Sequence, residues 1–124
     1  MLLAEDSEVV QKVATGMLKR LGIEVDLVTN GRQAVHAASE GRHDLILMDI
    51  HMPEVNGLDA TRQIRAALPK HTQPWIVAMT ASATREDRER CLEAGMDDYI
   101  TKPFRVQVLR DVFERCRGPR PGSS

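Results

Sequence analysis

The fold of this chain is decided by Leu45-Ile46-Leu47-Met48-Asp49, in which four consecutive apolar residues lead to a carboxylate. An unbroken apolar run is typical of a central parallel strand that is covered on both faces. The turn that follows is rich in turn-forming residues, with Pro53, Asn56 and Gly57, and it leads into a helical pattern. Strand, turn and helix in succession indicate an α/β fold.

Strand-like and helix-like patterns alternate along the rest of the chain, before and after this run. Further strands are expected at residues 2–4, 23–28, 75–80 and 97–101. Helical periods are expected at residues 8–21, 30–40, 58–68, 84–95 and 104–116. Five strands alternating with five helices predict a parallel sheet with helices on both faces. Residues 118–124 are rich in Gly, Pro and Ser, so we expect a single folded domain at 1–117 and a flexible tail or cloning remnant at 118–124.

Composition limits the classes of function. The chain has 124 residues, of which 42% are hydrophobic and 28% charged, as in an ordinary globular domain. A net charge of −1 gives no electrostatic case for nucleic-acid or membrane binding. No apolar stretch approaches the ~20 residues of a membrane span, and no signal peptide is evident, so a cytoplasmic setting is expected. Cys91 and Cys116 lack metal-type spacing and are expected to be reduced, half-buried thiols.

Polar side chains follow several of the predicted strands where each strand ends. Glu5 and Asp6 come after the first strand, Asp49 after the central one, and Thr80 and Lys102 after the last two. The carboxyl ends of parallel strands share one rim of a sheet, where ligands bind. Two carboxylates ~4 Å apart repel by roughly 4 kcal/mol at an effective dielectric constant of ~20. A divalent cation that binds oxygen ligands, magnesium or calcium, usually offsets this repulsion in proteins.

This rim has the groups that phosphoryl transfer needs. Asp49 is a candidate nucleophile and metal ligand, and the product on it is an acyl phosphate. The hydroxyl of Thr80 and the ammonium of Lys102 suit phosphoryl oxygens. Each residue also has a structural explanation when taken alone. The acids at positions 5 and 6 can favour a helix dipole, Asp49 can form a turn, and Lys102 can be a solvated surface residue. Their conjunction on one rim favours the functional interpretation.

Four motifs then identify a family. They are Leu2-Leu-Ala-Glu-Asp6, Leu47-Met-Asp49-Ile-His-Met-Pro53 with Gly57, Met79-Thr80-Ala81, and Asp98-Tyr-Ile-Thr-Lys102-Pro103-Phe104. These motifs, in this order and spacing, resemble the receiver domain of two-component response regulators, most of all the receivers at the C-terminus of hybrid sensor histidine kinases. The resemblance covers about residues 2–116. It implies a flavodoxin-like, doubly wound (βα)5 fold with strand order 2-1-3-4-5.

The resemblance also implies roles for individual residues. Asp49 is expected to accept phosphate from a phosphohistidine on a histidine kinase or a histidine-phosphotransfer protein. The expected ligands of Mg2+ are Glu5, Asp6, Asp49 and the backbone carbonyl of His51. The groups expected to bind the phosphoryl oxygens are Thr80, Lys102 and the amide of Ala81. Thr80 is expected to shift toward the phosphate and Tyr99 to move inward, and the Lys102-Pro103 bond resembles the family's cis peptide.

Such a domain is a phosphoacceptor that assists its own phosphorylation and dephosphorylation, and is not otherwise an enzyme. It is expected to contact neither nucleic acid nor membrane and to be a monomer or weak dimer. Two alternatives stay open: a pseudo-receiver that serves only as an interaction module, and a phosphatase with an aspartate nucleophile. Phosphatases of that kind need a second acid just after the nucleophile, whereas His51 stands two residues after Asp49.

Two departures from the family pattern stand out. Glu5 occupies a position where many receivers have Asp, so its longer arm affects metal geometry while the charge is kept. The first strand begins abruptly at Met1, which together with the tail suggests a domain excised from a hybrid kinase. Outside the motifs, His36, His43 and His71 show no ligand spacing and are expected at the surface. Val9 lies off the apolar stripe of the first helix and Val13 lies on its edge, so the two residues form either a docking surface for a helical partner or a slightly wide core face.

Overall fold

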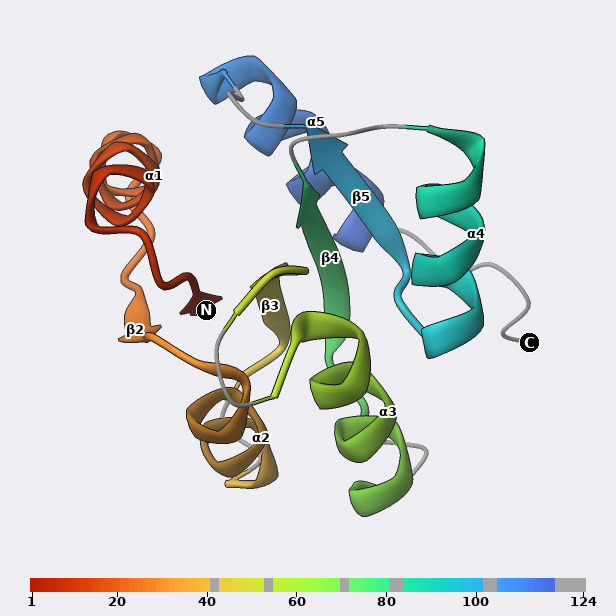
Figure 1. Ribbon diagram of the computed structural model, residues 1–124. Helices are drawn as coiled ribbons and strands as arrows, with labels where there is room; N and C mark the ends of the chain where they lie inside the picture. The colour runs from red at the N-terminus through yellow and green to blue at the C-terminus, as the bar shows by residue number, and fades with distance from the viewer. Residues whose placement is uncertain (41–42, 53–54, 70–71, 81–83, 102–104, 118–124) are drawn as a thin grey trace.

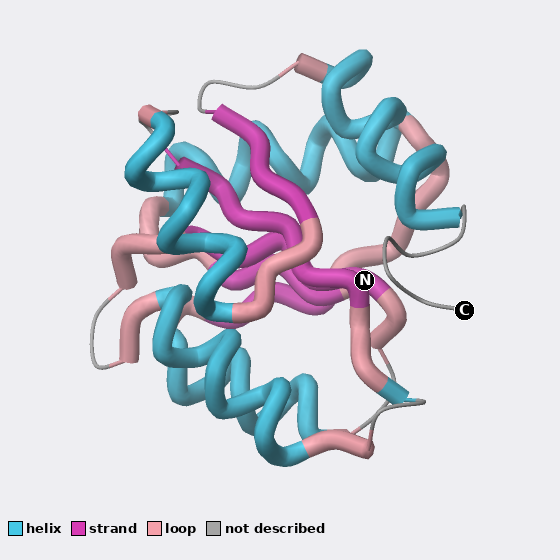
Figure 2. The backbone as a smooth tube through the Cα atoms, turned by 90° about the vertical axis from the view of Figure 1, so that its right-hand side faces the viewer, coloured by secondary structure: helices cyan, strands magenta, loops and turns pink. Residues whose placement is uncertain are grey.

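A computed structural model of the chain describes residues 1–40, 43–52, 55–69, 72–80, 84–101 and 105–117. Residues 116 and 117 are described by their backbone alone. Its five strands form one parallel sheet in the order β2-β1-β3-β4-β5, with helices on both sides (Figures 1 and 2). The elements are β1 (Leu2–Ala4), α1 (Glu8–Arg20), β2 (Asp26–Val28), α2 (Gly31–Ser39), β3 (Leu45–Asp49), α3 (Gly57–Ala67), β4 (Trp75–Thr80), α4 (Arg85–Ala94), β5 (Asp98–Thr101) and α5 (Val106–Arg117). The predicted fold class and strand order are confirmed.

The central strands β3 and β4 separate two hydrophobic cores. Every residue of both strands is buried, as their unbroken apolar runs predict. Because successive side chains of a strand point to opposite faces, Ile46 and Met48 enter the core under α2, α3 and α4. Leu47 enters the second core, where it meets Leu18 of α1 and Leu109 of α5. The sheet is therefore packed against a hydrophobic core on each face, which fixes the positions of its strand ends.

The second strand is shorter than its sequence pattern suggests. The expectation of a strand over residues 23–28 is wrong for its first half, because β2 comprises only Asp26–Val28. Its partner β1 offers three residues, and Leu2 pairs with Asp26 at the start of the ladder. Ile23 instead donates its backbone N–H to the carbonyl of Leu18 at 3.0 Å, after a left-handed turn at Gly22. Residues 23–25 therefore belong to the connection between α1 and β2 and not to the sheet.

Four of the helices begin with a capping side chain. In each, the oxygen of the N-cap residue accepts a hydrogen bond from the backbone N–H three residues later, which satisfies one of the free donors of the first turn. The capping residues are Ser7, Asn30, Asn56 and Thr84. Ser7 and Asn56 begin their helices in the loops that carry the acids of the rim, so capping fixes where these loops end.

Two residues outside the rim are more deeply buried than expected. Cys91 is a thiol, as predicted, but it lies in the core and is only 2% exposed. Burial, with the charge of Asp87, raises the pKa of this thiol, so it is a packing residue and not a nucleophile. The surface prediction is confirmed for His36 and wrong for His43, whose buried side chain lies 3.4 Å from the carboxylate of Asp26.

Several predictions concern residues beyond the described ranges. These are Ala81, Lys102, Pro103, Phe104, His71, the side chain of Cys116 and the tail 118–124, and the expectations for them stay predictions. Among the helices of the described ranges, none has both the length and the apolarity to span a membrane.

Candidate phosphoacceptor site

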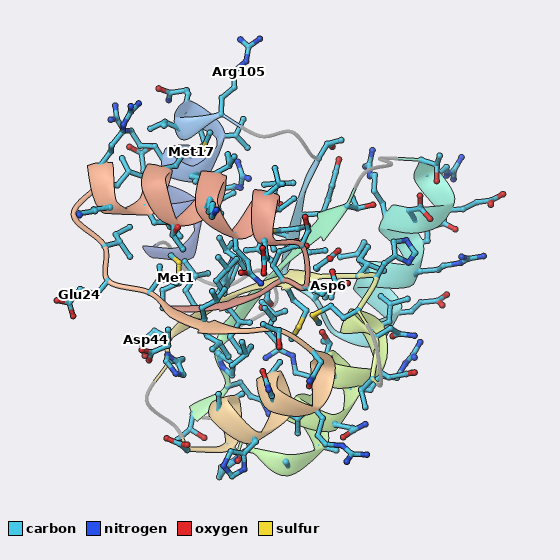
Figure 3. The ribbon with its side chains drawn as sticks, turned by 60° about the vertical axis from the view of Figure 1, so that its left-hand side comes forward. Met1, Asp6, Met17, Glu24, Asp44 and Arg105 are labelled. Carbon is cyan, nitrogen blue, oxygen red and sulfur yellow. The ribbon has the colours of Figure 1, made fainter. Side chains whose placement is uncertain are left out.

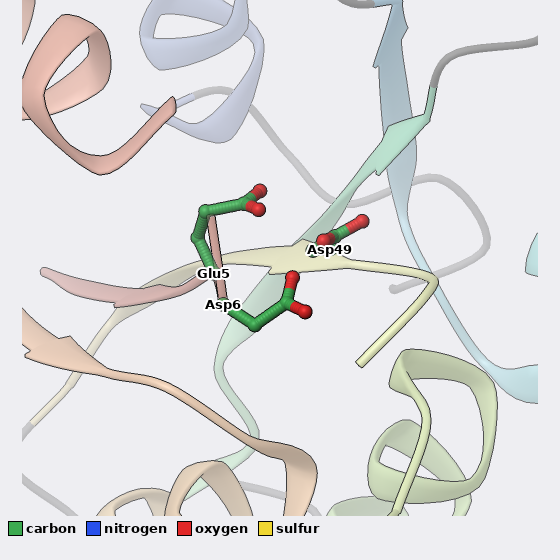
Figure 4. Close-up of side chains that lie close together, drawn as sticks. All are labelled: Glu5, Asp6 and Asp49. Atoms are coloured by element: carbon green, nitrogen blue, oxygen red, sulfur yellow. The ribbon is translucent and has the colours of Figure 1, made fainter. Parts of the chain in front are cut away.

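Three acidic side chains meet at the carboxyl-terminal rim of the sheet. Glu5 and Asp6 follow β1, Asp49 ends β3, and a carboxylate oxygen from each lies within 4.8 Å of the other two. Figure 4 shows the three carboxyl groups gathered at the end of β3. Asp6 stands at the opposite end of the sheet from Glu24 and Asp44, which precede β2 and β3 (Figure 3). The sequence prediction that the three acids share one rim is therefore confirmed as geometry.

The burial of this cluster makes its charge costly. Glu5 is fully buried and Asp49 is 4% exposed, whereas Asp6 is exposed. At an effective dielectric constant of ~20, two carboxylates at this separation repel by roughly 3 kcal/mol. In a magnesium octahedron, adjacent ligand oxygens are about 3 Å apart and opposite ones about 4 Å, so the carboxylate oxygens need to close by up to about 2 Å. Exposed Asp6 is free of the packing that holds the other two, and the donor set fits a hard divalent cation.

The loop after β1 turns the carboxylate of Glu5 back onto the backbone. Its Oε1 accepts a hydrogen bond of 3.1 Å from the N–H of Ser7, and its own N–H donates to the carbonyl of Val28 in β2 at 3.1 Å. The extra methylene of Glu, relative to Asp, is taken up by this bond to the N-cap residue. The longer side chain thus reaches the cluster in a defined orientation rather than as a free arm.

The loop after β3, like the loop after β1, is held by hydrogen bonds to its backbone. Asp49 Oδ1 accepts a hydrogen bond from the N–H of His51 at 3.2 Å, and Gly57 donates its N–H to the carbonyl of Ile50 at 2.9 Å. Gly57 packs so closely that an added Cβ at its position falls 2.2 Å from the carbonyl oxygen of Asp49. Gly57 therefore lets the first turn of α3 pack directly against the backbone of Asp49, which a residue with a side chain would prevent.

We expect Gly57→Ala to lower the free energy of unfolding by about 1–3 kcal/mol, because the new methyl group must push the Asp49 backbone aside. Chemical denaturation measures this loss. The matched control is Gly16→Ala in α1, where an added Cβ meets nothing within 4 Å and helix propensity favours Ala by roughly 0.5–1 kcal/mol. If both variants were equally stable, the close approach at Gly57 would have no energetic consequence.

Thr80 lies beside the acids at the end of the neighbouring strand. Asp49 pairs with Met79, the residue before Thr80, and Thr80 itself is 4% exposed. Thr80 pairs in turn with Thr101 of β5, so the strand ends of β3, β4 and β5 reach the same rim. The structure thus brings together Glu5, Asp6, Asp49 and Thr80, as the sequence predicts, while Lys102 stays a prediction.

A cavity of about 210 Å³ adjoins this rim between the β3–α3 loop and α4. Its lining includes His51 and Thr80, and further polar groups come from Asn56, the N-cap residue of α3, and from Asp87 and Arg90 of α4. Sequence patterns do not point to Asp87 or Arg90, because both stand in a strongly charged helix whose solvated face has the same composition. Only the packing of α4 against the rim distinguishes them.

Tyr99 occupies the middle of β5 and is partly buried against the core under α4. The guanidinium of Arg88 stands over its ring, 5.2 Å from the centroid, in a cation–π arrangement. Tyr99 also lines a surface hollow of about 480 Å³, together with Arg105 just before α5 and Arg115 within α5. In the strand ladder Tyr99 pairs with Ala78, two residues before Thr80, so the two residues belong to the same β4–β5 pair.

Comparison with known proteins gives the family directly. A family model described as the response regulator receiver domain matches residues 1–114. Hybrid signal transduction histidine kinase H of Dictyostelium discoideum is 44% identical over 119 residues, which cover 93% of this chain and 9% of that protein. The chain spans 15% or less of the length of this protein and of two further curated relatives, a probable rice histidine kinase and the sensor protein ArcB of Escherichia coli.

Solved structures of receiver domains have the same fold over nearly the whole length of this chain. The receiver domain of the sensor histidine kinase PA1611 from Pseudomonas aeruginosa, with magnesium in its active-site cleft, is 46% identical, with a TM-score of 0.83 over 92% of this chain and 93% of that one. A complex of the Saccharomyces cerevisiae phosphotransfer protein Ypd1 with the receiver domain of Ssk1 matches at 32% identity and a TM-score of 0.81, covering 90% of this chain and 83% of the matched one.

Proposed function

Because the chain belongs to the family of response regulator receiver domains, we propose that it is the phosphoacceptor switch of a two-component phosphorelay. The observation that carries this proposal is the buried carboxylate of Asp49, set within 4.8 Å of two further acids and one strand away from Thr80. Such a carboxylate is costly without a cation and well placed for a phosphoryl group once the cation is bound. A packing role alone explains neither feature.

In the proposed reaction, a carboxylate oxygen of Asp49 attacks the phosphorus of a phosphohistidine. The new P–O bond forms as the P–N bond breaks, and the imidazole leaves with the electron pair and takes up a proton. The product is an acyl phosphate on Asp49. Thr80, the predicted Lys102 and the amide of Ala81 donate hydrogen bonds to the phosphoryl oxygens and so stabilise their negative charge.

Magnesium is the proposed cofactor, and Glu5, Asp6, Asp49 and the backbone carbonyl of His51 are its proposed ligands. When bound, it offsets the repulsion among the carboxylates and the incoming phosphoryl oxygens. Two findings support this choice: the oxygen-only donor set suits a hard cation, and a 46% identical receiver holds magnesium in its cleft.

The same proposal covers the setting of the domain. The donor is a histidine kinase or a histidine-phosphotransfer protein, which the Ypd1–Ssk1 receiver complex supports, and the parent is a hybrid kinase, which the relative from Dictyostelium discoideum supports. We propose a cytoplasmic setting for it. The domain promotes its own phosphorylation and dephosphorylation, and catalyses no other reaction. After phosphorylation Thr80 moves toward the phosphate and Tyr99 turns inward, which changes the surface between α4 and α5. We propose that it works as a monomer or weak dimer, without nucleic-acid contact.

Intact mass spectrometry tests this function against the alternatives. The domain is incubated with magnesium and a small phosphodonor such as acetyl phosphate, and its mass is followed over time. We expect a single phosphoryl adduct that decays slowly after the donor is removed. Absence of any adduct would instead identify a pure interaction module, and rapid turnover of many donor molecules per domain would identify a phosphatase.

The donor protein is proposed to dock on the start of α1. Val9 is 72% exposed and Val13 is 47% exposed one turn later, so both present apolar groups on the helix that begins two residues after Asp6. Exposed apolar groups beside a phosphoacceptor fit the helical surface of a phosphotransfer protein.

We expect Val9→Asp to slow phosphoryl transfer from a phosphotransfer protein about tenfold, because a charge is placed in an apolar contact. Labelling by acetyl phosphate, which needs no docking, is expected to stay at the wild-type rate. The matched control is Leu92→Asp in α4, which changes another exposed apolar residue (64% exposed). Equal transfer to wild type and Val9→Asp would exclude α1 as the docking helix.

A further inference from the structure

The side chain of Gln11 reaches back from α1 to the loop that carries the acids. Its Nε2 donates a hydrogen bond of 2.6 Å to the backbone carbonyl of Glu5, six residues earlier. Helical side chains lean toward the N-terminus of their helix, so a residue one turn inside α1 covers the turn before it. The N–H of Gln11 also donates to the carbonyl of Ser7 at 2.9 Å, which fixes this residue in the first turn. The half-buried Gln11 thus joins the helix to the loop.

This bond completes the anchoring of Glu5. The N–H of Glu5 is bound to Val28 of β2, its carboxylate to the N–H of Ser7, and its carbonyl to Gln11. Strand, loop and helix therefore each hold one polar group of the same residue. The carbonyl of Glu5 belongs to the peptide group that joins it to Asp6. Because the side chain of Asp6 is exposed and has little packing of its own, its direction depends on how firmly this peptide group is held.

We propose that Gln11 is a positioning residue for the cation ligands Glu5 and Asp6, and that it sharpens the preference of the site for magnesium over calcium. This inference rests on the proposed function of the rim as a magnesium site. Magnesium demands near-octahedral ligands at 2.0–2.1 Å, whereas calcium accepts six to eight oxygens at 2.3–2.6 Å in flexible geometry. A loop released from Gln11 therefore penalises magnesium more than calcium.

The ratio of the two affinities separates positioning from simple stabilisation. If Gln11 only stabilised α1, its loss would lower the free energy of unfolding and leave the folded domain's affinity for both ions unchanged. A residue that aligns ligands changes the affinity of the folded state, because groups that orient metal ligands typically contribute about 10–100-fold to metal affinity.

The test compares wild type with Gln11→Met, which keeps the length of the side chain and removes its donor. Magnesium and calcium are each titrated into the metal-free domain, and binding is followed by the amide NMR signals of Ser7 and His51. We expect the dissociation constant for magnesium to rise about tenfold and that for calcium to rise about threefold or less. The control is Thr15→Val, which removes a hydroxyl that bonds the carbonyl of Gln11 at 2.7 Å, and it is expected to bind both ions as wild type does.

The outcomes distinguish this inference from the function on which it rests. Wild-type affinities in Gln11→Met, or equal weakening of both ions, would overturn the positioning role while leaving the magnesium site intact. A wild-type domain with no measurable magnesium affinity would overturn both the proposed function and the role of Gln11. A selective loss of magnesium affinity in Gln11→Met, with Thr15→Val unchanged, supports the role.

Discussion

Asp49→Asn is expected to abolish the phosphoryl adduct that the wild-type domain forms with acetyl phosphate and magnesium. The amide has nearly the shape of the carboxylate, so it fits the 4% exposed site, but it lacks the nucleophilic oxygen and the charge. Intact mass spectrometry is expected to find no adduct at any time. The change also removes one charge from the acidic cluster, so in the absence of divalent cations the free energy of unfolding is expected to rise.

Asp44→Asn provides the matched control for this result. Asp44 immediately precedes the same strand at its other end and is exposed (Figure 3), and its loss removes the same charge without touching the rim. We expect this variant to be phosphorylated at the wild-type rate. An adduct of wild-type yield on Asp49→Asn would show that another residue accepts the phosphate.

Arg65→Met is expected to cause the largest loss of stability, about 3 kcal/mol, measured as the free energy of unfolding in urea. Arg65 of α3 donates to Asp97 Oδ2 at 2.7 Å, and to the carbonyls of Pro74 and Gly95 at 2.8 Å each. The side chains of Arg65 and Asp97 are 20% and 12% exposed. Removing the guanidinium therefore leaves a largely buried carboxylate and two carbonyls without this donor.

The same helix offers a solvated ion pair for comparison. Arg62 lies 2.8 Å from Asp59, but both side chains are more than half exposed. Exposed pairs of this kind contribute ~0–1 kcal/mol, so Arg62→Met is expected to lower stability by about 0.5 kcal/mol or less. Similar losses in the two variants would mean that burial does not set the strength of the Arg65 network.

Local patterns predict the central part of the fold well. The unbroken apolar run ending at Asp49 and the similar run ending at Thr80 identify strands that are buried on both faces, and each is found where it is expected. The pattern over residues 23–28 misleads, because alternation reports which residues are half-buried and not whether a partner strand is present. Ile23 and Val25 are indeed half-buried, but they pack against the core beside α1 instead of pairing in the sheet.

The acids of the rim are predictable for a geometric reason, and their supports are not. Glu5 directly follows one parallel strand and Asp49 ends its neighbour, so both residues must lie at the same edge of the sheet. In contrast, the bond from Gln11 to the loop depends on a backbone orientation that no periodicity encodes. The Arg65–Asp97 pair spans 32 residues, and neither partner differs in the sequence from a solvated surface charge. Long-range polar contacts are therefore what the structure adds.

The most direct measurement is to identify the residue that carries phosphate after transfer from a phosphorylated histidine-phosphotransfer protein. The wild-type domain is labelled in the presence of magnesium, trapped, digested and mapped by tandem mass spectrometry, with a parallel sample containing a chelator. The proposed function predicts phosphate on Asp49 alone with magnesium, and none with the chelator. Phosphate on another residue, or transfer that is equally fast without magnesium, would contradict the role of this rim.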